Sequence, residues 1–163
     1  ATAPTGHTYF YKEVFNPDSQ LISVLANTVN EIVGSREVNL ILLDQIAYVE
    51  SPVDGSVWAD ELLAHGIIGE KAPKDLVRGI PTVLALLESR DDKGNPWVYF
   101  SEELTETIYE FEHYVWDPKK SDKPIDKDDH MMENLYRLVL TDLSFIPQED
   151  EAIYNRPIPF IQC

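Results

Sequence analysis

Apolar residues recur along the chain with two spacings, and these predict where helices and strands alternate. Between residues 21 and 33 apolar residues lie three and four positions apart, which is the spacing of one helix face. Helical patterns also cover residues 58–65, 76–88, 101–114 and 128–143. Short runs typical of strands lie at residues 7–15, 38–43, 67–68 and 97–100. The alternation predicts an α/β fold in which helices cover both faces of a sheet.

Asp44 follows the most apolar of the predicted strands. Residues 38–43 (VNLILL) are almost continuously apolar, as expected for a strand buried on both faces. Sites in such sheets form at the carboxyl ends of the strands. A carboxylate at this point is therefore either placed for function or caps the next segment.

A second acidic cluster opens the last predicted helix, where residues 128–133 read DDHMME. His130, Glu133 and Arg137 fall on one polar face, because residues three and four apart are neighbours on a helix. Glu133 and Arg137 have the spacing of an i,i+4 ion pair, and acids in a first turn favour the helix dipole. These structural roles explain everything except His130. The opposite, packing side carries Met132, Leu135, Tyr136, Val139 and Leu143.

Together the two acidic features fit the needs of phosphodiester hydrolysis by two metal ions. Mg²⁺ and Mn²⁺ prefer oxygen ligands, and several carboxylates, sometimes with a histidine, must converge on them. We therefore expect the side chains of Asp44, His130 and Glu133 to meet.

Charge and composition limit the other possibilities. Thirteen Lys and Arg against 29 Asp and Glu give a net charge of −16, so the chain alone should bind DNA poorly. This counts against a DNA-binding module more than against a DNA-cutting one, since divalent cations supply positive charge. Cys163 is the single cysteine, which excludes a disulfide framework. No run of 18 apolar residues predicts a membrane span.

The segment over residues 112–140, EHYVWDPKKSDKPIDKDDHMMENLYRLVL, resembles the end of the nuclease domain of viral (tailed-phage type) terminase large subunits. That family has a Tyr and a Trp, a loop, a Pro and then Asp-His-x-x-Asp-Ala before an apolar helix. LLDQIA at Asp44 resembles the family's second acidic strand. The segment from Lys71 to Gly79-Ile80 and the run WVYFSEELTETIYEFEHY also match in order and spacing. The resemblance covers about residues 8–143.

The resemblance implies an RNase H-like (ribonuclease H/integrase-type) mixed sheet flanked by helices. It implies a metal-dependent endonuclease that cuts concatemeric viral DNA, with a two-metal Mg²⁺ or Mn²⁺ site. Asp44, Glu133 and His130 would be catalytic, and Asp129 would be a further metal ligand. Double-stranded DNA, the ATPase domain, the small terminase subunit and the portal would be partners in the host cell cytoplasm. Residues 1–145 would form the nuclease domain, which lacks its first strand, and residues 146–163 an irregular tail.

The chain also departs from the family pattern. Glu133 stands where the family has Asp, Asn134 replaces the usual Ala, and Tyr136-Arg137 replaces Arg-Tyr. The family's first metal-binding Asp lies near the domain start, but ATAPTG holds no acid. The sequence therefore starts too late, or residues precede Ala1, or the site is incomplete. Two alternatives stay open: a catalytically incomplete fragment that is a docking or regulatory module, and another RNase H-like nuclease such as a resolvase or transposase.

Overall fold

The computed structural model describes residues 1–15, 21–125, 127–141 and 143–144, and within them the chain has a mixed α/β fold. The helices are α1 (Ile22–Val33), α2 (Trp58–Ala64), α3 (Leu76–Glu88), α4 (Thr105–His113) and α5 (His130–Val139), with a 3-10 turn η1 (Gln45–Tyr48). The strands are β1 (Thr8–Phe10), β2 (Leu42–Leu43), β3 (Glu70–Lys71), β4 (Val98–Phe100), β5 (Trp116–Asp117) and β6 (Lys120–Pro124). The helices thus lie close to where the apolar spacing predicts them.

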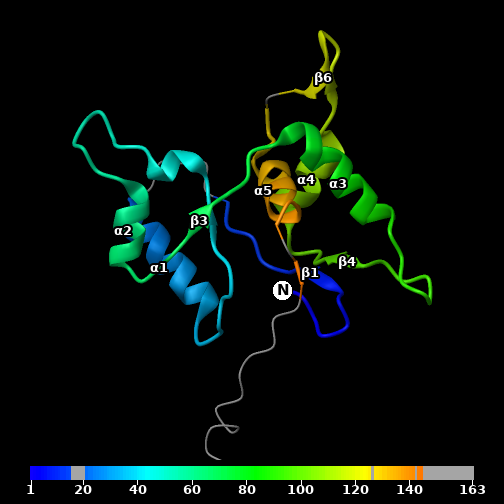
Figure 1. Cartoon of the computed structure of the whole chain (residues 1–163), viewed down its shortest axis with the longest axis horizontal. Coiled ribbons are helices and arrows are strands. Elements are labelled where there is room, and N and C mark those ends of the chain that lie inside the picture. The colour runs from blue at the N-terminus through cyan, green and yellow to red at the C-terminus, as the bar shows by residue number, and fades with distance from the viewer. Residues whose placement is uncertain (16–20, 126, 142, 145–163) are drawn as a thin grey trace, which may run out of the picture.

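The elements gather in two groups (Figure 1). At one end α1 packs on α2, and α2 packs on η1, with the β2–β3 pair beside them. At the other end α5 packs against both α3 and α4, with β1 and β4 below and the β5–β6 hairpin projecting above. The chain passes from the first group to the second through β3 and α3.

The described strands form three two-stranded sheets, not one joined mixed sheet. β1 pairs in parallel with β4, β2 pairs in parallel with β3, and β5–β6 is an antiparallel hairpin. The predicted strand over residues 38–43 shrinks to Leu42–Leu43, because Val38 lies in an exposed stretch and not in a buried one. The short strand predicted at residues 67–68 lies instead at Glu70–Lys71, which pairs with β2, while Ile67 is buried in the core and Ile68 is exposed.

The first group has a small apolar core of its own. Ala26 of α1, Leu62 of α2 and Ile67 are buried together, and partly buried neighbours complete the cluster. Gly69 lets β3 come close to β2, because a Cβ at that position would lie 2.5 Å from Cγ of Leu43. The core and this close approach together position the end of β2, where Asp44 begins η1.

The core of the second group lies between helices. Met132, Leu135 and Tyr136 are buried, as the spacing in the last helix predicts. Their side of α5 meets helix α3 rather than a sheet: Cδ2 of Tyr136 lies 2.5 Å from where a Cβ on Gly79 would stand. A glycine there allows the two helices to approach closely.

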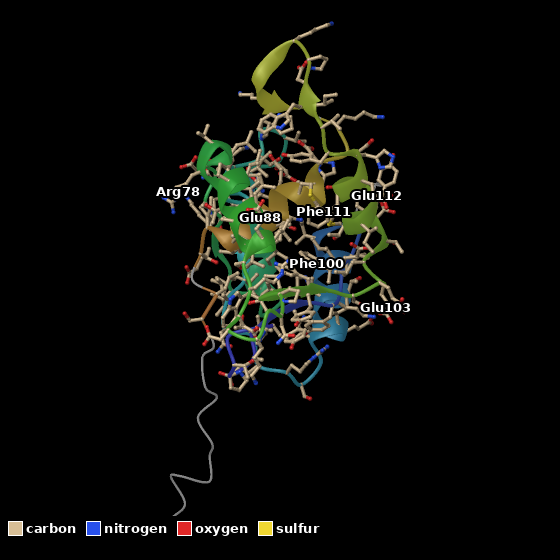
Figure 2. The ribbon with its side chains drawn as sticks, turned by 90° about the vertical axis from the view of Figure 1, so that its right-hand side faces the viewer. Arg78, Glu88, Phe100, Glu103, Phe111 and Glu112 are labelled. Carbon is tan, nitrogen blue, oxygen red and sulfur yellow. The ribbon has the colours of Figure 1, made fainter. Side chains whose placement is uncertain are left out.

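Aromatic side chains connect the strands of the second group to its helices. Phe10 of β1 stacks on Phe100 of β4, and Phe111 of α4 meets Phe100 edge-on with ring centroids 5.4 Å apart. Figure 2 shows Phe100 and Phe111 within the molecule, whereas Glu103 and Glu112 lie at its edge. The α4 helix is thus packed against the β1–β4 pair.

Helix α4 begins at Thr105, later than the predicted residue 101, because its cap comes from outside the helix. The carboxylate of Glu13 accepts hydrogen bonds from the backbone N–H of Glu106 (2.8 Å) and of Thr107 (3.0 Å). The hydroxyl of Thr107 donates a third bond at 2.7 Å. Burial opposes this, but the hydrogen bonds prevail and hold the pKa of Glu13 below its ordinary 4.5.

The remaining expectations concern the β5–β6 hairpin, the C-terminal segment and membrane-spanning helices. The segment before the last helix, to which the apolar pattern assigns no element, includes strand β6. The irregular tail expected at residues 146–163 lies outside the described residues. In the part of the chain that is described, no helix combines the length and the apolar character needed to cross a membrane.

Candidate functional site

Asp44 lies at the carboxyl end of β2, as predicted, where the strand turns into η1. Its Oδ1 accepts a hydrogen bond from the backbone N–H of Ile46 at 2.8 Å, so the residue caps η1. This hydrogen bond, together with the charges of Arg137 and Lys74 and against the effect of burial, holds the pKa of Asp44 below its ordinary 3.8. The carboxylate therefore stays ionised at neutral pH.

Glu133 lies in the first turn of α5 and forms the ion pair that the spacing predicts. Its Oε2 accepts a hydrogen bond from Nη2 of Arg137 at 2.7 Å, one helical turn along. Helix α5 places both side chains on the side that faces the end of β2, because Arg137 also reaches Asp44. The two acids that the sequence marks thus come together.

The group that joins them is the guanidinium of Arg137. Its Nη1 lies 2.5 Å from Oδ2 of Asp44, while its Nη2 holds Glu133. The Arg137 side chain is 7% exposed. The polar helix face predicted from the spacing is therefore buried where Arg137 lies. Burial by itself lowers the pKa of Arg137, but hydrogen bonding with Tyr136 and the charges of Glu133 and Asp44 raise it overall. One buried cation therefore neutralises part of the charge of both acids.

This bridge also connects the two groups of elements. Asp44 belongs to the β2–η1 segment, and Arg137 belongs to α5, which packs against α3 and α4. Breaking a buried pair by removing one partner is strongly destabilising, because the charge left behind is uncompensated. The bridge therefore helps to set how the two groups sit relative to each other.

Glu110 is a functional candidate that the sequence reasoning missed. It lies on α4 and is 3% exposed, and its Oε2 accepts hydrogen bonds from the backbone N–H of Met131 (2.7 Å) and of Met132 (2.9 Å). It thus caps α5 from a neighbouring helix and fixes the turn that carries Glu133. Nothing close to Glu110 in the sequence signals this role, since its partners are backbone groups 21 and 22 residues along the chain.

Tyr114 lies close to the same end of α5. Burial, followed by the negative charge of Asp129 and other nearby groups, raises the pKa of the Tyr114 hydroxyl to about 12. It therefore stays protonated and can donate a hydrogen bond. Tyr114 also lines an apolar pocket of about 180 Å³ between α3, α4 and α5. The pocket walls carry mostly apolar side chains such as Ile80 and Leu84, and the lining includes no carboxylate or histidine that would hold Mg²⁺ or Mn²⁺.

The other predicted site residues lie at the start of α5, and in the described part of the chain neither forms an ion pair with Arg137. His130 is exposed at the first position of α5, and Asp129 is half-buried at its N-cap. Among the residues described, no three His, Cys, Asp or Glu side chains gather as a metal ion would require. Two carboxylates and a guanidinium carry one net negative charge, and two divalent cations need more oxygen donors than these. The donor set, as arranged, does not fit a two-metal site.

Comparisons with protein-family models, with curated proteins and with solved structures found no match to this chain.

Proposed function

We propose that this chain is the nuclease domain of a viral DNA-packaging terminase large subunit, with an RNase H-like fold and an acidic site at Asp44 and Glu133. One observation carries the proposal. Asp44 and Glu133 share the guanidinium of Arg137 at the end of a parallel strand pair. The two acids are far apart in the sequence, and their positions in predicted elements mark both of them. The mixed α/β fold agrees with this reading.

In this proposal Asp44 and Glu133 are the carboxylates that would hold Mg²⁺ or Mn²⁺, with His130 and Asp129 at the same helix start. Because the described donors do not fit two metal ions, further oxygen ligands have to come from elsewhere in the protein. The net charge of −16 repels DNA phosphates. Double-stranded DNA would therefore be held by the ATPase domain, the small terminase subunit or the portal, in the cytoplasm of the host cell.

A plasmid-nicking assay with Mn²⁺ tests the proposal. This chain and the longest form of the protein that contains it are compared, and Asp44→Ala and Glu133→Ala are made in the longer form. We expect slow or no nicking by the chain alone, clear nicking by the longer form, and loss of nicking in both variants. Glu88→Ala is the matched control, because it removes an exposed acid at the end of α3. Nicking that survives Asp44→Ala contradicts the assignment of the site.

A second candidate function belongs to a different class. The chain would be a catalytically incomplete docking or regulatory module of the packaging motor, and the observation that favours it is that Arg137 already satisfies both acids. In that case the longer form would not nick DNA, but it would still bind its packaging partners. Another RNase H-like nuclease, such as a resolvase, would instead cut branched DNA in preference to linear duplex.

A further inference from the structure

The guanidinium of Arg137 lies in the place that a cation would take between Asp44 and Glu133. Each of its two terminal nitrogens contacts a different carboxylate, at 2.5 Å and 2.7 Å. Its Nε is buried and makes no hydrogen bond within the described part of the chain. An arginine with an unsatisfied buried donor is held there by the two acids rather than by a full set of partners.

A guanidinium and a divalent cation compete for the same oxygens. Arg137 occupies Oδ2 of Asp44 and Oε2 of Glu133, and Oδ1 of Asp44 accepts from the backbone of Ile46. A metal ion that entered beside the guanidinium would also meet its positive charge at close range. Both effects disfavour metal binding while the arginine is present.

We propose that Arg137 is an internal counter-ion that closes the Asp44–Glu133 pair to divalent cations, so that a metal ion can bind there only when the guanidinium has left. This rests on the proposed function, in which these acids are metal ligands, and it adds a reason why the chain alone should be inactive. Completion of a two-metal site then requires further oxygen ligands as well as displacement of Arg137, whereas a single metal ion needs only the displacement.

The test measures Mn²⁺ binding directly, by isothermal titration calorimetry at neutral pH and moderate salt. The wild-type chain is compared with Arg137→Met, which keeps an apolar side chain of similar length and removes the charge. We expect saturable Mn²⁺ binding in Arg137→Met and none in wild type over the same concentration range, a difference of at least tenfold in apparent affinity. Adding Asp44→Asn to Arg137→Met should abolish the new binding.

Arg78→Met is the matched control, since Arg78 is an exposed arginine on α3 and its loss changes the net charge equally. If Arg78→Met and Arg137→Met strengthen Mn²⁺ binding equally, the effect is general electrostatics and the proposal is overturned. It is also overturned if wild type binds Mn²⁺ as tightly as Arg137→Met.

A second measurement on the wild-type chain covers the case in which Arg137→Met does not fold. The thermal midpoint of wild type should not rise with Mn²⁺, because a ligand stabilises a protein only when it binds the folded state. A rise that Asp44→Asn removes would show metal bound beside Arg137 and would contradict the proposal. Loss of plasmid nicking in the longer form leaves these binding results unchanged, so the two proposals fail separately.

Discussion

Replacing Glu110 by Ala should destabilise the chain, because this buried carboxylate caps α5. Two backbone N–H groups, those of Met131 and Met132, donate to its Oε2 at 2.7 Å and 2.9 Å. Loss of a helix cap costs about 0.5–2 kcal/mol, and a hydrogen bond to a charged group contributes about 1.5–3 kcal/mol. The two donors would also be left unsatisfied at a buried position. We therefore expect the free energy of unfolding to fall by about 2 kcal/mol, or about 4–8 °C in thermal midpoint for a chain of this size.

The assay is urea and thermal unfolding followed by circular dichroism. Glu112→Ala is the matched control, because Glu112 lies on the same helix but at the edge of the molecule (Figure 2). Exposed substitutions of this kind change stability by less than about 0.5 kcal/mol. Glu110→Gln, which keeps an acceptor oxygen but not the charge, should lie between the two. If Glu110→Ala unfolds at the same urea concentration as Glu112→Ala, the capping role is refuted.

Three further predictions concern packing, pH and DNA. Gly79→Ala should cost about 1–3 kcal/mol in unfolding experiments, because its Cβ would stand 2.5 Å from the Tyr136 ring, whereas exposed Val77→Ala should change little. The lowered pKa of Glu13 contributes stability that is present above pH 4.5 and is lost as pH falls through the folded-state pKa. Glu13→Gln should therefore flatten the acid side of the curve of stability against pH. A curve unchanged from wild type would contradict this. Filter binding at physiological salt without metal should show weak affinity for duplex DNA, and tight binding would contradict the effect of the −16 charge.

The helices could be predicted from the sequence because their signals are local. Apolar spacing places α1, α3 and α5 within a few residues, and it identifies the i,i+4 pair of Glu133 and Arg137. The position of Asp44 at a strand end was also predictable, since an apolar run stops there. Each of these depends on residues close together in the chain.

The remaining features depend on contacts between distant segments. Arg137 is buried because Asp44 reaches it from another group of elements, and nothing near it in the sequence indicates this. The late start of α4 depends on Glu13, and the pairing of the described strands into two-stranded sheets joins segments far apart in the chain, such as β1 and β4. The RNase H-like sheet and the metal ligands inferred from the resemblance stay predictions.

A double-mutant cycle tests most directly whether Asp44 and Glu133 form one site through the shared guanidinium of Arg137. Asp44→Asn and Glu133→Gln are made singly and together, and urea unfolding gives the three losses in free energy. Each single variant leaves Arg137 one ionised partner, whereas the double variant leaves a buried charge with none. The double variant should therefore lose more stability than the sum of the two single losses, with a coupling of about 0.5–3 kcal/mol. Losses that add to within about 0.3–0.5 kcal/mol would contradict it.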